Sequence, residues 1–486
     1  MSLKKIFQNR HFPFWLLTIA VLSGFILPVL IMDGMFMDGL LYATVSNNLA
    51  NDYGSMWFLK FSEYGFANNP TFHEHPPLVF WIQSLFYSVL GDSIYVERFY
   101  SFLMAVLTAL LMVKTWKMVT KGDKNLSQMS WLSIILWIII PVSYWAYQNN
   151  LQENTMGLFS ILSVYYGLKA VHLKKKTWLN LTLCGGMIFC AAFSKGVPGF
   201  FTLGLIFFHW IIFRKQSFGK MVLQNLYVII ITFGILGLIL LNPSANESLT
   251  IYFNERLGGR VSEAHLRESH FYILGRLFWE LLPLIIICGI TLLIYKAKKV
   301  ETHLKGDNSK WITFFLIIGL CGSVPIMLTL VQKSFYMCAA LPYFGIAFAL
   351  LIAPGMATNI AHINRSKTGF KIFKATMPLA IMTIIVITIF NSNKKSRDFD
   401  ELHDAYLVEE IIPHKSNISF HPLMHNEWDM RIILMRYFDI SVDVSEERSY
   451  PYYLMQKQLG LEPDSSYVKI DLPTVKYDLY KKIESP

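Results

Sequence analysis

Two acidic residues follow the first long apolar run of the chain. They stand in the segment Asp33-Gly-Met-Phe-Met-Asp38-Gly-Leu-Leu-Tyr42-Ala43. A carboxylate at a membrane surface can accept the proton of an acceptor hydroxyl while it faces a donor carried on a lipid. Asp also commonly ends one helix and begins the next, and the residues alone leave these two interpretations of Asp33 and Asp38 open.

A second polar group stands in the segment Thr71-Phe-His73-Glu74-His75-Pro-Pro-Leu. Imidazole and carboxylate groups suit zinc, so the His-Glu-His run could bind a metal ion. In an extended segment, however, alternate residues point to opposite sides, and Glu74 then faces away from the two histidines. A cap before a helix that starts at proline is the simpler interpretation for His73 and His75. Glu74 remains a candidate for chemistry.

Polar residues also interrupt the later apolar runs. The run 149–154 holds five polar residues between two expected spans, with Glu153 as its acid. Such residues are costly in a membrane unless they face water or a polar cavity. Lys195 and Lys333 each stand where two apolar runs meet, and an ammonium group there can hold a phosphate as a point charge. A solvated turn and lysines that snorkel to the interface are the ordinary alternatives.

Three arginines and one histidine extend this set of candidate phosphate ligands. Arg98 lies early in an expected span, where burial of its charge is expensive. Arg256, Arg260 and His270 stand in a long polar loop, and they could join the two lysines at a phosphate.

The composition places these residues in a membrane protein. The chain of 486 residues is 54% hydrophobic and 16% charged, whereas a soluble protein of this size carries about a quarter charged residues. Its net charge of +10 fits Lys and Arg in cytoplasmic loops. No basic, aromatic-rich soluble face indicates nucleic acid as a partner. The five cysteines all stand in apolar runs without metal-ligand spacing, as small buried hydrophobes do.

Apolar runs long enough to cross a hydrocarbon core recur along the chain, and we expect them to be helices because backbone groups in lipid must be satisfied within the segment. About eleven candidate spans of sufficient length are present. They cover residues 14–32, 95–119, 129–147, 155–171, 178–193, 197–213, 222–241, 272–295, 311–331, 335–352 and 372–390. Every second loop is basic, which predicts a cytoplasmic N-terminus and, after an odd number of spans, a C-terminal segment outside.

The remaining polar regions define the expected domains. We predict an all-α transmembrane domain over residues 1–391, with a first external loop at 33–94 and a second at 242–271. The short apolar run 76–90 is expected to lie at the outer interface as a helix. Residues 392–486 are expected to form a small extracytoplasmic α/β domain. Its predicted helices cover 397–411 and 427–437, and its predicted β-rich runs cover 440–444 and 467–472.

Taken in order, these features resemble the GT-C superfamily of glycosyltransferases that use lipid-linked sugars. The resemblance is strongest to the bacterial branch containing aminoarabinose lipid A transferase, which is related to the protein O-mannosyltransferases, and it extends over nearly the whole chain. The family's first-loop acid followed by Tyr-Ala is similar to Asp38 with Tyr42, although Gly39 replaces a second acid. The family's Glu-Lys-Pro-Pro-Leu stretch is similar to Glu74-His75-Pro-Pro-Leu, with His75 in place of Lys.

Later motifs match the family in the same order. A Gly-x-x-x-x-x-x-Arg element ends at Arg98, and the family's second-loop Asp corresponds to Glu153, a longer acid. Lys195 precedes a glycine, as in the family's Lys-Gly motif. Lys333 and Tyr336 match its Lys-x-x-Tyr motif.

The resemblance implies a fold of about 11–13 transmembrane helices and an inverting transfer of a sugar from a polyprenyl-phosphate donor. The acceptor would be a lipid, a glycan or a protein on the outer face of a bacterial inner membrane. The catalytic residues would be Asp38, which orients or deprotonates the acceptor, and Glu153.

Binding roles follow from the same resemblance. The departing phosphate would be held by Lys195, Lys333, Arg98, Arg256, Arg260 and Tyr336. The substrates would contact Tyr42, Glu74 and His75. A divalent ion assists some relatives, and its expected ligands here are Glu74 and His270.

Two other functions stay open. One is a transporter or flippase for a lipid-linked substrate. Transporters concentrate polar residues on broken helices near the middle of the membrane, whereas the acids here gather in the outer loops. The other is an assembly subunit without catalysis, which predicts that Asp38→Asn leaves function intact. The residues name neither the sugar nor the acceptor.

Overall fold

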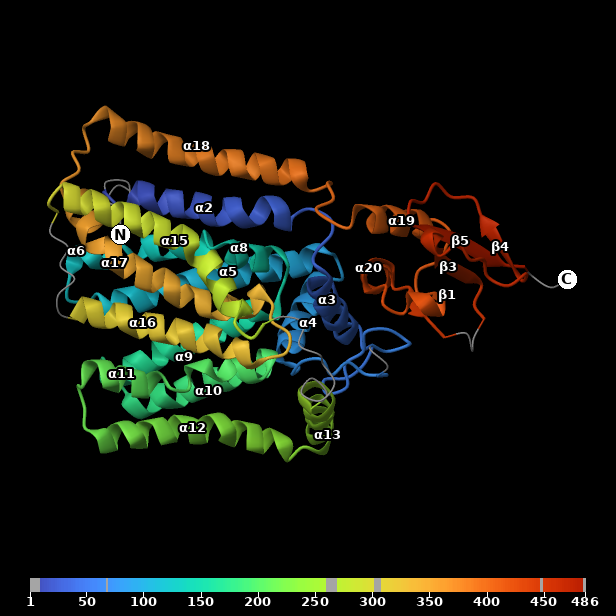
Figure 1. Cartoon of the computed structure of the whole chain (residues 1–486), viewed down its shortest axis with the longest axis horizontal. Coiled ribbons are helices and arrows are strands. Elements are labelled where there is room, and N and C mark those ends of the chain that lie inside the picture. Colours follow the sequence, from blue (N-terminus) through green and yellow to red (C-terminus); the bar gives the residue numbers. More distant parts are fainter. Residues whose placement is uncertain (1–8, 67–68, 259–268, 301–306, 446–448, 484–486) are drawn as a thin grey trace. The chain divides into compact units, whose positions relative to one another are not determined.

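The computed structural model describes residues 9–66, 69–258, 269–300, 307–445 and 449–483 (Figure 1). By its internal contacts the chain divides into two units. We call Met1–Val29 with Ser101–Phe390 the helical unit, and Leu30–Tyr100 with Asn391–Pro486 the mixed unit. The first loop is therefore grouped with the C-terminal segment, whereas the predicted boundaries put it in the transmembrane domain.

The helical unit is a bundle whose long helices run side by side in Figure 1. Three of its helices extend by a few residues into the mixed unit, namely α2, α5 and α18. Its helices are α2 (Phe12–Leu30), α5 (Tyr95–Val119), α6 (Lys124–Ser127), α7 (Ser130–Ile138), α8 (Pro141–Gln148), α9 (Gln152–Val171), α10 (Thr177–Lys195), η1 (Val197–Thr202), α11 (Leu205–Phe213), α12 (Phe218–Leu240), α13 (Pro243–Ile251), η2 (Tyr252–Gly258), α15 (Tyr272–Ala297), α16 (Asp307–Ser323), η3 (Val324–Leu328), η4 (Ser334–Ala340), α17 (Leu341–Ala361) and α18 (Thr368–Asn391).

The protein is a multi-pass membrane protein. Within the described residues, 8 helices are long and apolar enough to cross a membrane, or up to 9 if one bent pair is a single span. All the segments predicted as spans are helical, so the larger predicted number comes from two of them. α9 carries a polar first turn, and residues 197–213 form short helices rather than one long one.

One predicted span, 129–147, is broken in the structure. α7 and α8 meet at a bend of 79°, because Pro141 at the start of α8 cannot continue a helix. The next backbone N–H, at Val142, donates to the carboxylate of Glu280 at 2.8 Å. Glu280 is buried in α15 and also pairs with Arg276 at 3.2 Å. A carboxylate from a distant helix therefore satisfies the backbone N–H that follows the bend.

The mixed unit combines the first loop with a small α/β fold, as the sequence predicts for the C-terminal segment. The loop contributes α3 (Met37–Ala50) and α4 (Leu78–Leu90). α4 matches the short helix predicted at 76–90, whose depth in the membrane stays a prediction. The C-terminal elements are α19 (Phe399–Glu409), β1 (Asn417–Phe420), η5 (Pro422–Met424), α20 (Trp428–Phe438), β2 (Ser441–Asp443), β3 (Tyr452–Gln456), η6 (Lys457–Leu459), β4 (Tyr467–Ile470) and β5 (Tyr477–Lys482).

The strands form one five-stranded sheet with the order β2-β1-β3-β5-β4. β1 is parallel to β2 and β3, and β5 is antiparallel to β3 and β4. Ile418, Leu454 and Leu479 lie in its buried core. Both helices and both β-rich runs predicted for this region are confirmed, while β1, β3 and β5 were not predicted.

Glu280 gives a first test of the bundle. Glu280→Leu removes the acceptor of the Val142 N–H, and an unsatisfied buried donor costs about 1–3 kcal/mol. We expect a lower thermal midpoint for the purified protein in detergent, and a smaller loss for Glu280→Gln, which keeps a carbonyl acceptor. Glu247→Leu on the exposed surface of α13 is the matched control. Equal midpoints for Glu280→Leu and the control would contradict this account of the bend.

Candidate functional site

Glu153 and Lys195 form a buried ion pair in the helical unit. Lys195 Nζ lies 3.2 Å from Glu153 Oε1, and the two side chains are 8% and 1% exposed. Glu153 stands in the first turn of α9 and Lys195 is the last residue of α10. An acid at a helix N-terminus and a cation at a C-terminus are both favoured by the helix dipole. Two packed helices thus present one charge each at the same end of the bundle.

The glycine that follows Lys195 ends α10 at this point. Gly196 has a φ of +91°, which lies in the region that glycine adopts without the steric cost of a Cβ. The Lys-Gly motif therefore has a structural meaning: the helix stops directly after the residue that carries the charge.

Tyr336 and Lys333 lie at the segment η4, which packs against α9. Lys195 Nζ lies 6.0 Å from the centre of the Tyr336 ring, at the outer limit for an attraction between a cation and an aromatic face. Lys333 is the residue before η4 and is exposed. The structure therefore brings Glu153, Lys195 and Tyr336 together, with Lys333 three residues before Tyr336.

Gln152 belongs to the same end of the bundle and was not among the predicted site residues. It is 1% exposed, and among the residues that the structure describes neither its amide oxygen nor its amide nitrogen has a hydrogen-bond partner. Leaving such groups buried and unsatisfied costs about 1–3 kcal/mol each. The neighbouring Asn154, by contrast, donates to the carbonyl of Ala146 at 2.9 Å. The polar run 149–154 contained this signal, but the prediction considered only its acid.

The mixed unit gathers a second set of predicted residues. Asp38 is half-buried in the first turn of α3, and Tyr42 follows one turn later on the same face. The Tyr42 hydroxyl lies 3.1 Å from Nε2 of His75, and the two rings meet edge to face with centres 5.5 Å apart. Asp38, Tyr42 and His75 are thus brought to one face of α3, and Glu74 is the half-buried neighbour of His75.

Among the described residues, those predicted to bind a metal ion are not arranged as a set of ligands. His73 is buried against the Thr71 hydroxyl at 2.8 Å, which fits a structural role. His270 is exposed, with Nδ1 2.8 Å from the carbonyl of Met327. Within the described part of the chain no group of three or more His, Cys, Asp or Glu side chains could hold an ion. Glu74 and His270 lie in different units, and the divalent ion stays a prediction.

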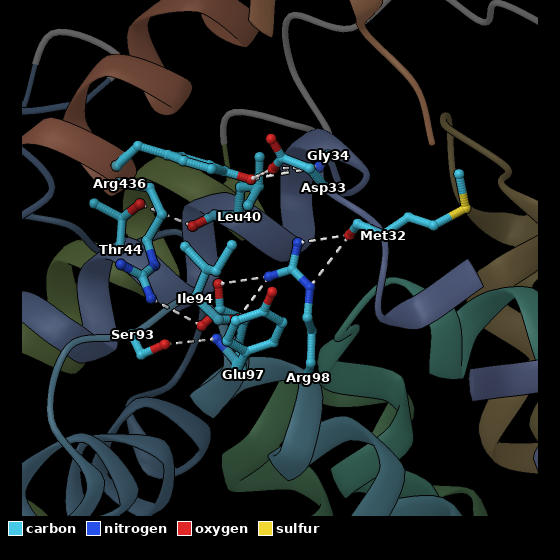
Figure 2. Close-up of polar contacts among 12 residues, drawn as sticks. Met32, Asp33, Gly34, Leu40, Thr44, Ser93, Ile94, Glu97, Arg98 and Arg436 are labelled. Atoms are coloured by element: carbon cyan, nitrogen blue, oxygen red, sulfur yellow. Dashed lines mark hydrogen bonds and ion pairs between the residues drawn. The ribbon is translucent and has the colours of Figure 1, made fainter. Parts of the chain in front are cut away.

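Arg98 is enclosed by backbone carbonyls (Figure 2). Its guanidinium donates to the carbonyl of Met32 at 2.9 and 3.3 Å and to that of Ile94 at 2.6 Å. It also lies 3.5 Å from the carboxylate of Glu97, and its side chain is 3% exposed. These contacts indicate a structural role for Arg98. Its predicted contact with the donor phosphate stays a prediction.

The remaining predicted residues lie in the second loop. Arg256 falls in η2, and its side chain lies outside the described residues, as does the whole of Arg260.

A family model and two solved structures resemble this chain. Residues 74–240, about a third of the chain, match the family described as dolichyl-phosphate-mannose-protein mannosyltransferase. The predicted family resemblance is confirmed. The matched segment contains five of the predicted site residues, namely Glu74, His75, Arg98, Glu153 and Lys195. A comparison with curated proteins found no match.

Two of the similar solved structures are those of ArnT from Cupriavidus metallidurans. One is bound to undecaprenyl phosphate; it is 13% identical, with a TM-score of 0.64 over 97% of this chain and 98% of that chain. The other, in the apo state, has the same identity and TM-score over 96% and 97%. At this identity the likeness shows the fold, and the predicted GT-C fold with its C-terminal α/β domain is confirmed.

The pairing of Glu153 with Lys195 can be tested by stability. Removing one partner of a buried ion pair costs about 3–5 kcal/mol, whereas replacing both by neutral groups is often harmless. We expect Lys195→Met to lower the thermal midpoint in detergent and the double variant Lys195→Met/Glu153→Gln to recover most of the loss. Additive losses in the double variant would show that the two charges do not interact.

An exposed pair in the same unit serves as the control. Lys215 and Asp307 lie 3.2 Å apart with side chains 39% and 57% exposed. Exposed pairs contribute about 0–1 kcal/mol, so Lys215→Met should leave the midpoint almost unchanged.

Proposed function

We propose that this protein is a membrane glycosyltransferase that transfers a sugar from a polyprenyl-phosphate donor to an acceptor outside the cytoplasm. The observation that carries the proposal is the buried pair of Glu153 and Lys195, because both members lie within the segment that matches the mannosyltransferase family. The ArnT fold over nearly the whole chain supports it, and one of those structures is bound to undecaprenyl phosphate.

On the donor side of the reaction, the lysines stabilise the departing phosphate. As the bond between the sugar and the phosphate breaks, its electron pair leaves with the polyprenyl phosphate, whose negative charge grows. Preorganised cations aimed at that charge lower the barrier most effectively when they are shielded from water. Glu153 holds Lys195 in place, and both side chains are buried away from water. The exposed Lys333 can approach the phosphate from the solvent side.

On the acceptor side of the reaction, the first loop supplies the residue that activates the acceptor hydroxyl. Asp38 takes the proton of the acceptor hydroxyl as the acceptor oxygen forms its bond to the sugar. Tyr42 lies one turn further along α3, and its hydroxyl contacts His75. A single displacement of this kind inverts the configuration at the sugar carbon.

A transfer assay tests the proposal directly. Purified protein is mixed with a panel of radiolabelled polyprenyl-phosphate sugars and a lipid and envelope fraction as the source of acceptors. Label should move to an acceptor with the wild type. Asp38→Asn should lower the rate about 10²–10⁴-fold, the contribution typical of a general base. Asp52→Asn, an exposed acid of the same loop, is the matched control.

The same assay separates the alternatives. Transfer that is unchanged in Asp38→Asn would remove that residue from the mechanism. If no donor gives transfer, but label crosses the bilayer of liposomes that contain the protein, the chain is a transporter instead.

Gln152 gives a second test, because its amide has no hydrogen-bond partner within the described part of the chain. If the amide binds the donor, Gln152→Leu should raise the KM for the donor about tenfold, as expected for one lost hydrogen bond to a buried group. The thermal midpoint should not fall, since the leucine removes two unsatisfied polar atoms. A fall in the midpoint without a change in KM would mean that Gln152 serves the fold alone.

A further inference from the structure

Asp33, the first acid of the loop, is bound on all sides by the C-terminal segment of the mixed unit. The Tyr437 hydroxyl donates to its Oδ1 at 2.6 Å and the Tyr406 hydroxyl to its Oδ2 at 2.9 Å. Its backbone N–H donates to the carbonyl of Lys394 at 2.8 Å, and its carbonyl accepts from the N–H of Ser396 at 2.7 Å. Both carboxylate oxygens and both backbone groups of Asp33 are therefore used.

The two tyrosines are suited to this role over a wide pH range. Burial raises the pKa of the Tyr406 hydroxyl, and the neighbouring Asp33 carboxylate raises it further. Burial likewise raises the pKa of Tyr437, with Asp33 adding to the effect and the Arg98 cation opposing it. Both hydroxyls thus stay protonated, and able to donate, above the ordinary pKa of tyrosine.

The other end of the first loop is held by the residue next to Tyr437. Arg436 Nη2 lies 2.8 Å from the carboxylate of Glu97, which also accepts from the Tyr87 hydroxyl at 2.8 Å. The side chains of Arg436 and Glu97 are 2% and 0% exposed. Figure 2 shows the contact of Arg436 with Glu97 beside those of Arg98 with Met32. Two consecutive residues of α20 therefore hold residues 33 and 97, which bracket the loop.

The segment between Asp33 and Asp38 also packs closely against the C-terminal segment. Gly34 has a φ of +83°, and a Cβ added there would come within 2.9 Å of the carbonyl oxygen of Arg397. The guanidinium of Arg397 lies 5.2 Å from the centre of the Phe36 ring, and Phe36 caps α3. The residues that lead into α3 thus follow the surface of the C-terminal segment, so that segment determines where the first turn of α3 begins.

We infer that the C-terminal segment is a positioning element of the transferase, in which Tyr406 and Tyr437 act through Asp33 to set the place of the Asp38 carboxylate. Asp33 is then a positioning residue and Asp38 the catalytic one. This inference rests on the proposed function for the role of Asp38, but the hold on residues 33–43 is independent of it. In this inference the C-terminal segment affects the rate of the chemical step, and its role is not limited to recognition of the acceptor.

The decisive variant is the double substitution Tyr406→Phe/Tyr437→Phe, which keeps both rings and removes both hydroxyls. Hydrogen exchange of residues 33–43 should become faster in this variant. In the transfer assay kcat should fall about ten- to a hundredfold, because a small misplacement of a catalytic group is costly, while the KM values for donor and acceptor stay within about twofold of the wild type. Tyr452→Phe, whose hydroxyl contacts the carbonyl of Ile411 in the same fold, is the control.

Asp33→Asn supplies a second variant with its own readout. If the tyrosines act through Asp33, adding Asp33→Asn to the double variant should cause little further loss of kcat, since residues that share one interaction are not additive. The single variant Tyr437→Phe keeps one hydroxyl on Asp33 and tests the same point if the double variant folds poorly.

The outcomes separate the two proposals. Unchanged exchange of residues 33–43 together with unchanged kcat would overturn the positioning role. A raised acceptor KM with unchanged kcat would also overturn it, and would assign the segment to acceptor recognition. If the wild type transfers no sugar, the proposed function fails, and the exchange rates still decide whether the C-terminal segment holds the loop.

Discussion

Pairing of buried charge is the constraint on which both units depend. An isolated ion in a low-dielectric interior costs several kcal/mol, and a partner with good geometry offsets most of this cost. In the mixed unit Glu97 and Arg436 meet this condition almost without exposure. In the helical unit Glu153 and Lys195 do so. The first pair joins elements that are far apart in the sequence and the second joins the consecutive helices α9 and α10, so satisfying the charges also fixes how these elements pack.

The two pairs differ in what they leave available. Glu97 and Arg436 are joined by the Tyr87 hydroxyl and the carbonyl of Asp92, which is a network suited to holding a loop. Lys195 is the last residue of α10 and is paired with Glu153, and in our proposal its ammonium group contacts the phosphate while it keeps this partner. The same kind of interaction thus serves structure in one unit and, in our proposal, chemistry in the other.

Much of the fold could be predicted from local patterns. The spans follow from apolar runs whose length matches a bilayer, and this signal needs no distant contact. The helices α19 and α20 follow from periodic apolar residues in short segments. The bend at Pro141 was missed because it lies inside an apolar run long enough for one span, and the carboxylate that accepts the Val142 N–H comes from Glu280, 138 positions from Val142. The strands β1, β3 and β5 were missed because two of the pairings that place them in the sheet, β1 with β3 and β3 with β5, join strands that are not consecutive in the chain.

The sequence by itself determined which residue types were available for chemistry: the acids at positions 38 and 153, the lysines at 195 and 333, and the tyrosines near them. The residues alone left Asp33 and Asp38 with the same two interpretations, and only the family resemblance singled out Asp38. The tertiary structure showed that the carboxylate of Asp33 is engaged by Tyr406 and Tyr437, which lie 373 and 404 positions from Asp33. Such contacts form only when the chain has folded, because no local pattern links residues so far apart.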